Sequence, residues 1–226
     1  MGLWARLTDK ARREGLPYAL QRLSRRLPPA LFYANRFVVF ALDLPLAQQP
    51  ASEAVREAGP ADALALAHEG RRRAKIQARF DGGARVWVEE HDGRLVGHAW
   101  CDPRSLPWDH CLRLTGAPGD IWSSDGWVAP DQRGKGCYTR VKGAAARACA
   151  EAGYRRLIAA VDALNRNSVR ANRAIGAEPV SRGFLLRLLG LCLVGHDGRI
   201  QIGIWTETKP LELRLARYFA ADDDSC

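Results

Sequence analysis

The sequence lacks any hydrophobic run long enough to cross a membrane as a helix. Its longest apolar tract, from Gly183 to Gly195, has thirteen residues and is interrupted by Arg187, whereas a spanning helix needs about twenty apolar residues. We therefore expect this tract to form a buried strand or one arm of a hairpin.

The cysteine pattern of a metal site or of a disulfide framework is also absent. The six cysteines include no CxxC pair, and no secretory signal precedes them. We therefore expect reduced thiols, a cytoplasmic protein and no bound metal.

What the sequence does contain is the composition of one folded domain. Hydrophobic residues make up 47% and charged residues 26% of the 226 residues, which is ordinary for a globular protein. This length accommodates one sizeable core, so we expect a single catalytic domain with appendages.

Positive charge is concentrated at the N-terminus. Residues 1–36 carry eight basic and two acidic side chains, a net charge of +6 out of +9 for the whole chain, and Leu3, Trp4, Leu7 and Ala11 would share one face of a helix. A basic amphipathic segment of this kind is typical of proteins at an anionic membrane surface, here its inner face. The alternative is a helix that packs on its own domain. Nucleic acid is a less favoured partner, because no recognised binding motif accompanies the charge.

Elements before residue 120 are predicted from periodicity and turn residues. A short β-branched and aromatic run predicts a strand at 37–42, and two alternating runs around an Asp-Gly turn predict a hairpin at 85–90 and 94–100. We expect helices at 52–58 and 61–74. Residues 102–119 read as a loop long enough to cover an acceptor pocket.

A strand, a glycine-rich basic turn and a helix are predicted between residues 120 and 152. Pro130 has no backbone N–H to donate to a neighbouring strand and therefore ends the strand. Gly134 and Gly136 permit backbone conformations that other residues rarely adopt. Backbone N–H groups at the start of such a helix converge on an anion, and Arg133 and Lys135 add charge. The pattern indicates a phosphate-binding loop, although many junctions of this kind bind nothing.

Alternating elements continue after this helix. An apolar run predicts a buried strand at 156–161, and capping residues followed by a glycine predict a short helix at 165–177. We expect further strands at 179–193 and 199–206, the second after an Asp197-Gly198 turn. Residues 210–219 are predicted as a terminal helix.

Two of these segments together resemble a known family, the GNAT superfamily of acyl-coenzyme A dependent N-acyltransferases. The similarity is strong over residues 120–178 and covers 36–119 and 179–206 only through the order of elements. The motifs that carry it are Val128-x-Pro130-x-x-Arg133-Gly134-x-Gly136, similar to the pyrophosphate loop, and Asn165-x-x-Ser168-x-x-x-Asn172-x-x-x-Gly176, similar to the following helix.

The resemblance implies an α+β fold of three layers, with a mixed, mostly antiparallel sheet that splays at its central strands. We expect a basic amphipathic helical extension at 1–35, the acyltransferase domain at 36–206, and a C-terminal helix and tail at 207–226.

The resemblance also implies the ligands. Acetyl-coenzyme A or a longer acyl-coenzyme A is the expected co-substrate, and a primary amine, lipid-like as one candidate, is the expected acceptor. The residues implied in coenzyme binding are Trp127, Val128, Arg133, Gly134, Lys135, Gly136, Cys137, Tyr138, Thr139, Asn165 and Asn172.

Two positions depart from the family pattern, and the catalytic groups remain open. Tyr138 replaces the last small residue of the loop, and Asn172 stands where many relatives carry a tyrosine that protonates the departing thiolate. Asp125 is our candidate base, with a capping or pairing role as the alternative, and His98 is a weaker candidate. Tyr138 is our candidate proton donor, with space filling as the alternative. A catalytically silent module that binds coenzyme A or a membrane surface is the competing interpretation of the whole chain.

Overall fold

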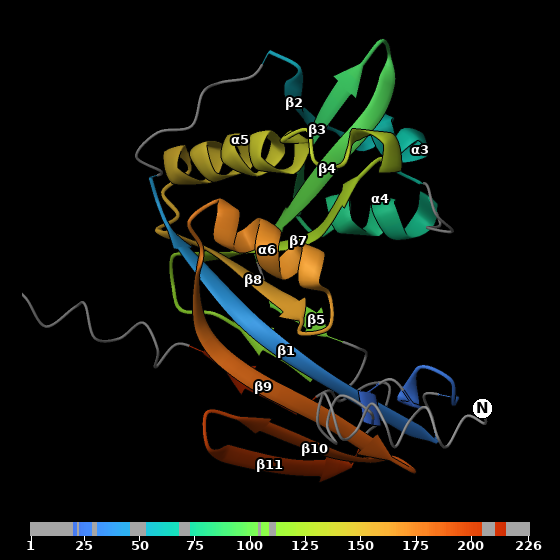
Figure 1. Cartoon of the computed structure of the whole chain (residues 1–226). Coiled ribbons are helices and arrows are strands. Elements are labelled where there is room, and N and C mark those ends of the chain that lie inside the picture. The colour runs from blue at the N-terminus through green and yellow to red at the C-terminus, as the bar shows by residue number, and fades with distance from the viewer. Residues whose placement is uncertain are drawn as a thin grey trace, which may run out of the picture.

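The computed structural model describes residues 20–21, 23–28, 31–45, 53–67, 73–103, 105–108, 112–204 and 211–215 (Figure 1). The predicted amphipathic segment around Leu3 and the C-terminal tail lie outside these residues. The division of the chain into three parts stays a prediction. The strand that opens the domain begins at Phe32, before the predicted boundary.

A nine-stranded sheet organises the molecule, in the order β11-β10-β9-β1-β8-β7-β4-β3-β2. Neighbouring strands are antiparallel except for β7 and β8, which are parallel, so the predicted mixed, mostly antiparallel sheet is confirmed. The strands are β1 (Phe32–Asp43), β2 (Val55–Ala58), β3 (Arg85–His91), β4 (Arg94–Asp102), β7 (Asp120–Val128), β8 (Arg156–Asp162), β9 (Glu178–Leu188), β10 (Leu191–His196) and β11 (Arg199–Ile204).

Layers on both faces of this sheet complete the three-layer fold. Helices α5 (Cys137–Glu151) and α6 (Arg166–Ala174) cover one face, where Val141 and Ile175 join a core cluster with Phe40. The other face is covered at one end by α3 (Ala63–Leu66) and α4 (Arg73–Asp81). At the other end it is covered by a three-stranded sheet of β5 (Leu106–Trp108), β6 (Leu112–Thr115) and β12 (Leu211–Arg214). Figure 1 shows α3 to α5 and the β9–β11 strands at opposite ends of the molecule.

The predicted hairpin between β3 and β4 is confirmed, with its turn at Asp92 and Gly93. Both residues have positive φ, 50° and 73°, the backbone conformation that such two-residue turns require. The strands at 37–42, 120–128 and 156–161 and the helices at 135–152 and 165–177 are likewise found, with bounds that differ from the expected ones by at most five residues.

The prediction of a helix at 52–58 is wrong. Residues 55–58 form β2, an edge strand that pairs with β3, and Arg56 in this strand binds Asp62 and Glu90 at 2.8 and 2.6 Å. These tertiary contacts override the helix preference of a run of alanine, glutamate and arginine. The helix predicted at 61–74 is replaced by α3 and α4, and α4 continues to Asp81.

Two predictions near the second sheet are also wrong. Residues 102–119 contain β5 and β6, not only loop, and residues 211–214 of the predicted terminal helix form β12. The strands depend on each other, since β12 pairs with β6, about one hundred residues earlier in the chain. The strand predicted at 179–193 is a hairpin of β9 and β10, with a turn at Leu189 and Gly190.

No helix in the described part of the chain has the length and apolar character needed to cross a bilayer.

Candidate active site

The site begins where β7 and β8 separate. They pair only over Asp120–Trp122 and Arg156–Ile158, although both strands continue for several residues, so the predicted splay is confirmed. A slot of about 280 Å³ opens between them. It is lined by β7 residues 123–126, by Tyr138 of α5, by β8 residues 159–162, and by Asn165, Ser168 and Asn172 at α6.

A second, larger pocket of about 600 Å³ adjoins the slot. Ser124, Asp125, Ala160 and Asp162 line both cavities, so the two meet at the open ends of β7 and β8. The remaining lining residues of the larger pocket come from the segment before β1 and from β1, α4, β4 and β5: Arg25, Tyr33, Asn35, Arg79, Asp102 and Leu106.

Asp125 lies at this junction, and its side chain contacts the same arginine as the side chain of Ser124. Arg79 Nη1 donates to Asp125 Oδ2 at 3.0 Å, and Arg79 Nη2 donates to Ser124 Oγ at 2.7 Å. Pairing with β4 shifts register at this point, and Asp125 has a φ of 51°, which together indicate a bulge that re-aims its side chain. The Asp125 side chain stays 30% exposed, so a ligand can reach it.

Asp162 is a second carboxylate at the junction, and sequence analysis missed it. Gln21 Nε2 donates to its Oδ1 at 2.9 Å, Arg25 Nη2 donates to its Oδ2 at 2.5 Å, and the Leu164 backbone N–H donates to its Oδ1 at 2.7 Å. Residues from the N-terminal region therefore complete the larger pocket. An aspartate at the end of a buried strand, directly before a helix, was the signal that could have revealed it.

The predicted phosphate loop runs from Arg133 to the first turn of α5. Gly134 and Gly136 have φ values of 79° and 78°, which confirms that the turn needs glycine. Gly136 is the N-cap of α5, so the first backbone N–H groups of the helix point out of its end. Arg133 and Lys135 are exposed beside it, and Arg133 Nε donates to the Val128 carbonyl at 3.2 Å.

An ion pair between a buried glutamate and a half-buried arginine contacts the backbone of this loop. The Glu89 side chain is 0% exposed and binds Arg140 Nη2 at 2.6 Å. Arg140 Nη1 in turn donates to the Lys135 carbonyl at 2.9 Å. Burial alone would raise the pKa of Glu89, but hydrogen bonds and charge from Arg140, with a hydrogen bond from His91, hold that pKa below its usual value. Neither Glu89 nor Arg140 was predicted as a site residue.

Cys137 and Tyr138 point in different directions from the start of α5. The Cys137 thiol is buried under β4, where it donates to the Val96 carbonyl at 3.8 Å, and burial with the nearby Glu89 charge raises the pKa of the thiol to about 12. Only its backbone can face a ligand. The Tyr138 ring lines the slot and lies so close to β7 that a Cβ at Gly126 would come within 2.6 Å of it.

Two of the other predicted coenzyme-binding residues, Asn165 and Asn172, line the slot, whereas Trp127 and Thr139 do not. Trp127 stacks on His98, with ring centroids 5.8 Å apart, so its side chain packs away from the slot lining. Asn165 caps α6 by accepting from the Ser168 N–H at 3.1 Å. Asn172 is buried and donates to the Ser168 carbonyl at 2.9 Å. Thr139 is half-buried in the first turn of α5.

These residues fit the phosphates and thioester arm of a coenzyme A conjugate. The exposed cations and helix N-terminus suit an anion, and the slot between β7 and β8 leads from that end of α5 to the carboxylates of the larger pocket. No cluster of potential metal ligands occurs among the described residues.

Comparisons with known proteins agree with this geometry. A crystal structure of a GNAT-family acetyltransferase from Novosphingobium aromaticivorans aligns with a TM-score of 0.50 and 19% identity over 80% of this chain and 70% of the other. A Drosophila protein aligns with a TM-score of 0.50 and 14% identity over 74% of this chain and 54% of its own length, so this chain spans about half of that protein. At such identities the likeness shows the fold alone. No functionally curated protein matches the chain.

A model of the acetyltransferase (GNAT) family matches residues 52–176. The matched region is more than half of the 226 residues and contains β7, the predicted phosphate loop, α5, β8 and α6. The chain therefore belongs to the acetyltransferase (GNAT) family.

Proposed function

We propose that this protein is an N-acyltransferase that transfers an acyl group, acetyl or longer, from a coenzyme A thioester to a primary amine. The observation that carries the proposal is the meeting of two cavities at four shared residues. One cavity would hold the donor and the other the acceptor. Bringing two reactants together in this way can lower a barrier by roughly 7–11 kcal/mol.

The donor would lie along the slot, with its phosphates at the loop from Arg133 to Thr139. The open edge of β7 and the N-terminal turn of α5 supply backbone hydrogen-bond donors along that path. Glu89 and Arg140 would act through the Lys135 carbonyl to keep the loop in its binding conformation.

The acceptor amine would enter the larger pocket and must lose a proton to attack the thioester. Asp125 and Asp162 both line the junction, and either carboxylate can take that proton directly or through one water molecule. The leaving thiolate needs a proton in return. The Tyr138 phenol lines the slot and is the group we propose for that step, with solvent as the alternative source.

We further propose that the acceptor is amphipathic, with a lipid-like part, and that the protein works at the inner face of a membrane. The larger pocket combines three carboxylates with the side chains of Tyr33 and Leu106, which suits an amine on a partly apolar molecule. The basic N-terminus supports the same location.

The test is to incubate the purified chain with acetyl- and longer acyl-coenzyme A and a panel of amines that includes amino acids, polyamines and aminolipids. Release of free thiol that depends on one class of amine supports the proposal. If no amine raises thiol release above the rate with water, transferase activity is excluded for that panel.

A silent binding module is the second candidate, and Asn172 favours it. Its amide is buried and bonded within α6 to the Ser168 carbonyl, so it offers no proton at the position where many relatives have a tyrosine. Tight binding of acyl-coenzyme A in calorimetry, together with no turnover on the amine panel, would support this candidate.

A further inference from the structure

The β9–β11 arm, residues 178–204, exposes an unusual amount of apolar surface. Of the ten large hydrophobic side chains that are exposed in the described residues, seven lie on this arm, and Ile200, Ile202 and Ile204 are 64%, 65% and 77% exposed. The other four are Phe184, Leu188, Leu189 and Leu191. Monomeric proteins rarely leave such a contiguous patch without a partner.

Strand register places six of these side chains on one face, and the seventh, Leu189, lies in the turn between β9 and β10. Leu188, Leu191 and Ile204 form one row across the three strands, and Phe184, Gly195 and Ile200 form another. The row between them is Leu186, Leu193 and Ile202. A Cβ at Gly195 would come within 2.1 Å of the Phe184 ring, so the ring lies across the glycine and keeps the face flat. None of the nine positions in these three rows therefore carries a polar side chain.

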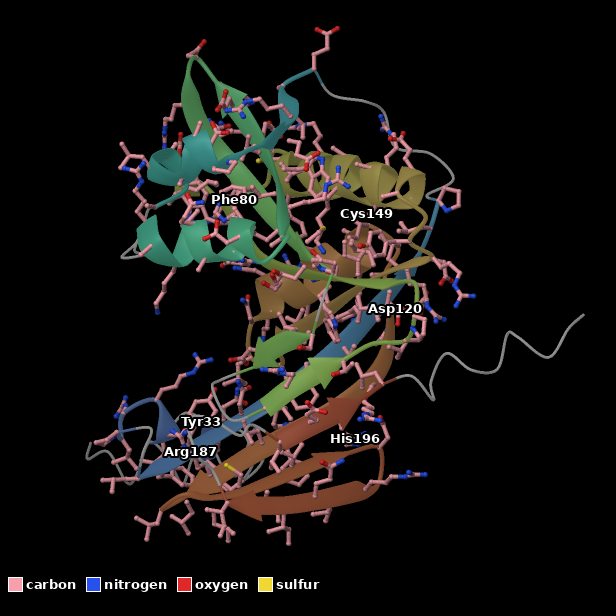
Figure 2. All side chains as sticks on the ribbon, turned by 180° about the vertical axis from the view of Figure 1, so that it is seen from behind. Tyr33, Phe80, Asp120, Cys149, Arg187 and His196 are labelled. Atoms are coloured by element: carbon pink, nitrogen blue, oxygen red, sulfur yellow. The ribbon has the colours of Figure 1, made fainter. Side chains whose placement is uncertain are left out.

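The opposite face of the arm is buried inside the protein. Leu185, Cys192 and Val194 are buried in the cluster with Leu213 of β12 and Leu112 of β6. The apolar outer face therefore cannot be explained as the inner face of this domain. Figure 2, seen from behind, shows the arm at the end of the molecule, with Arg187 and His196 on it.

The outer face of the arm lies on the same side of the sheet as α6. Phe184 pairs in register with Arg36 of β1, and Arg36 shares a strand face with Val38. Val38 packs in the cluster that contains Val169 and Ile175 of the α6 region. A flat partner on this side can meet both the arm and the α6 surface.

That side of the molecule is basic. Arg36 and Arg182 are exposed at the border of the apolar rows. Arg166, Arg170 and Arg173 line a groove of about 260 Å³ on α6, and among the described residues none of these three forms an ion pair. A flat apolar face with a cationic border matches the interface of an anionic bilayer, in which acyl chains lie behind phosphate groups.

We propose that the outer face of the β9–β11 arm, bordered by Arg36 and Arg182 and with the three α6 arginines on the same side of the sheet, is a contact surface for an anionic lipid membrane. The proposal extends the proposed function, because it names the surface through which the enzyme would reach a lipid-like acceptor. The binding itself requires neither donor nor acceptor and can be measured without turnover.

The test is sedimentation of the full chain with phosphatidylcholine vesicles that contain or lack phosphatidylglycerol. We expect binding only to the anionic vesicles, and weaker binding as salt rises, since screening shortens the reach of the charges. The triple variant Ile200→Thr/Ile202→Thr/Ile204→Thr keeps β-branched residues in β11. It should bind at least about tenfold more weakly, since burial of one aliphatic side chain contributes roughly a tenfold factor.

Two controls separate the arm from other causes. Leu64→Thr changes a side chain that is 72% exposed on α3, away from the arm, and should leave binding unchanged. Arg166→Gln/Arg170→Gln/Arg173→Gln should reduce the salt dependence while the apolar contribution remains. Thermal unfolding of the isoleucine variant should match that of the wild type, because all three side chains are exposed.

The proposal is overturned if the wild-type chain does not sediment with anionic vesicles, or if the isoleucine variant binds as well as the wild type. Binding lost only when Leu3, Trp4 and Leu7 are changed to glutamine would assign the contact to the N-terminal segment instead. A concentration-dependent dimer in light scattering that the isoleucine variant abolishes, without lipid binding, would assign the face to a second copy of the chain. Thiol release with a water-soluble amine, measured in parallel, reports the proposed function separately.

Discussion

Glu89 in β3 and Arg140 in α5 form a buried pair, with Arg140 Nη2 2.6 Å from Glu89 Oε1 and Arg140 Nε 3.1 Å from Glu89 Oε2. The remaining nitrogen of the guanidinium holds the Lys135 carbonyl. A carboxylate in the sheet therefore fixes the backbone of the predicted phosphate loop through one arginine.

Glu89→Gln should weaken donor binding more than it slows chemistry. Loss of a charge-assisted pair in a buried place costs on the order of 2 kcal/mol, and a loosened Lys135 backbone should raise the KM for acyl-coenzyme A about tenfold while kcat changes less. Steady-state kinetics measures KM and kcat, and urea unfolding measures the loss of stability. Glu57→Gln, which removes a partly exposed pair with Arg85, is the matched control. Equal KM values in the two variants would show that the pair does not position the loop.

Acid should destabilise the protein through the same carboxylate. The pKa of Glu89 in the folded state is held below its usual value of 4.5, so the unfolded chain binds the proton more readily. The stabilising contribution is present above about pH 4.5 and is lost as pH falls through the lower, folded pKa. Urea unfolding from pH 6 down to about pH 3 should show a steeper loss for the wild type than for Glu89→Gln. Parallel curves would contradict this account.

Gly136→Val should abolish acyl-coenzyme A binding. The φ of 78° at Gly136 is strained for any β-branched residue, and the added side chain would meet Arg140 Nη1, which is 3.1 Å from the Cβ position. Calorimetric titration measures the affinity. Gly59→Val is the control, because Gly59 has extended backbone and nothing within 4 Å of the Cβ position. Unchanged affinity in Gly136→Val would exclude this loop as the phosphate site.

One of the two junction carboxylates should take the proton from the acceptor amine. If Asp125 is the base, Asp125→Asn should lower kcat/KM by about 100-fold or more, whereas Asp162→Asn should lower it much less. The reverse pattern would assign the base to Asp162. Asp131→Asn, at an exposed pair with Arg94 outside both cavities, controls for the loss of a carboxylate. If both variants keep the wild-type kcat/KM, neither aspartate is the base.

Local chemistry made the loop, the hairpin and the central strands predictable. Pro130, Gly134 and Gly136 act on their own backbone and on immediate neighbours, and the Asp92-Gly93 turn is set by two residues. The same locality explains why the family motifs at Arg133 and Asn165 can be recognised in the sequence alone. The long amphipathic helix α5 follows from its own periodicity.

Non-local contacts decided what the sequence left open. Residues 55–58 and 211–214 are strands because β3 and β6 offer them hydrogen bonds, and such pairing depends on partners far along the chain. Arg79 meets Asp125 across 46 residues, and Gln21 meets Asp162 across 141. Side-chain direction at a bulge and the meeting of distant charges have no local signature, because both arise only when the strands are assembled. The sequence by itself determined the loop that would hold phosphate, and the tertiary structure alone decided which carboxylates line the junction of the two cavities.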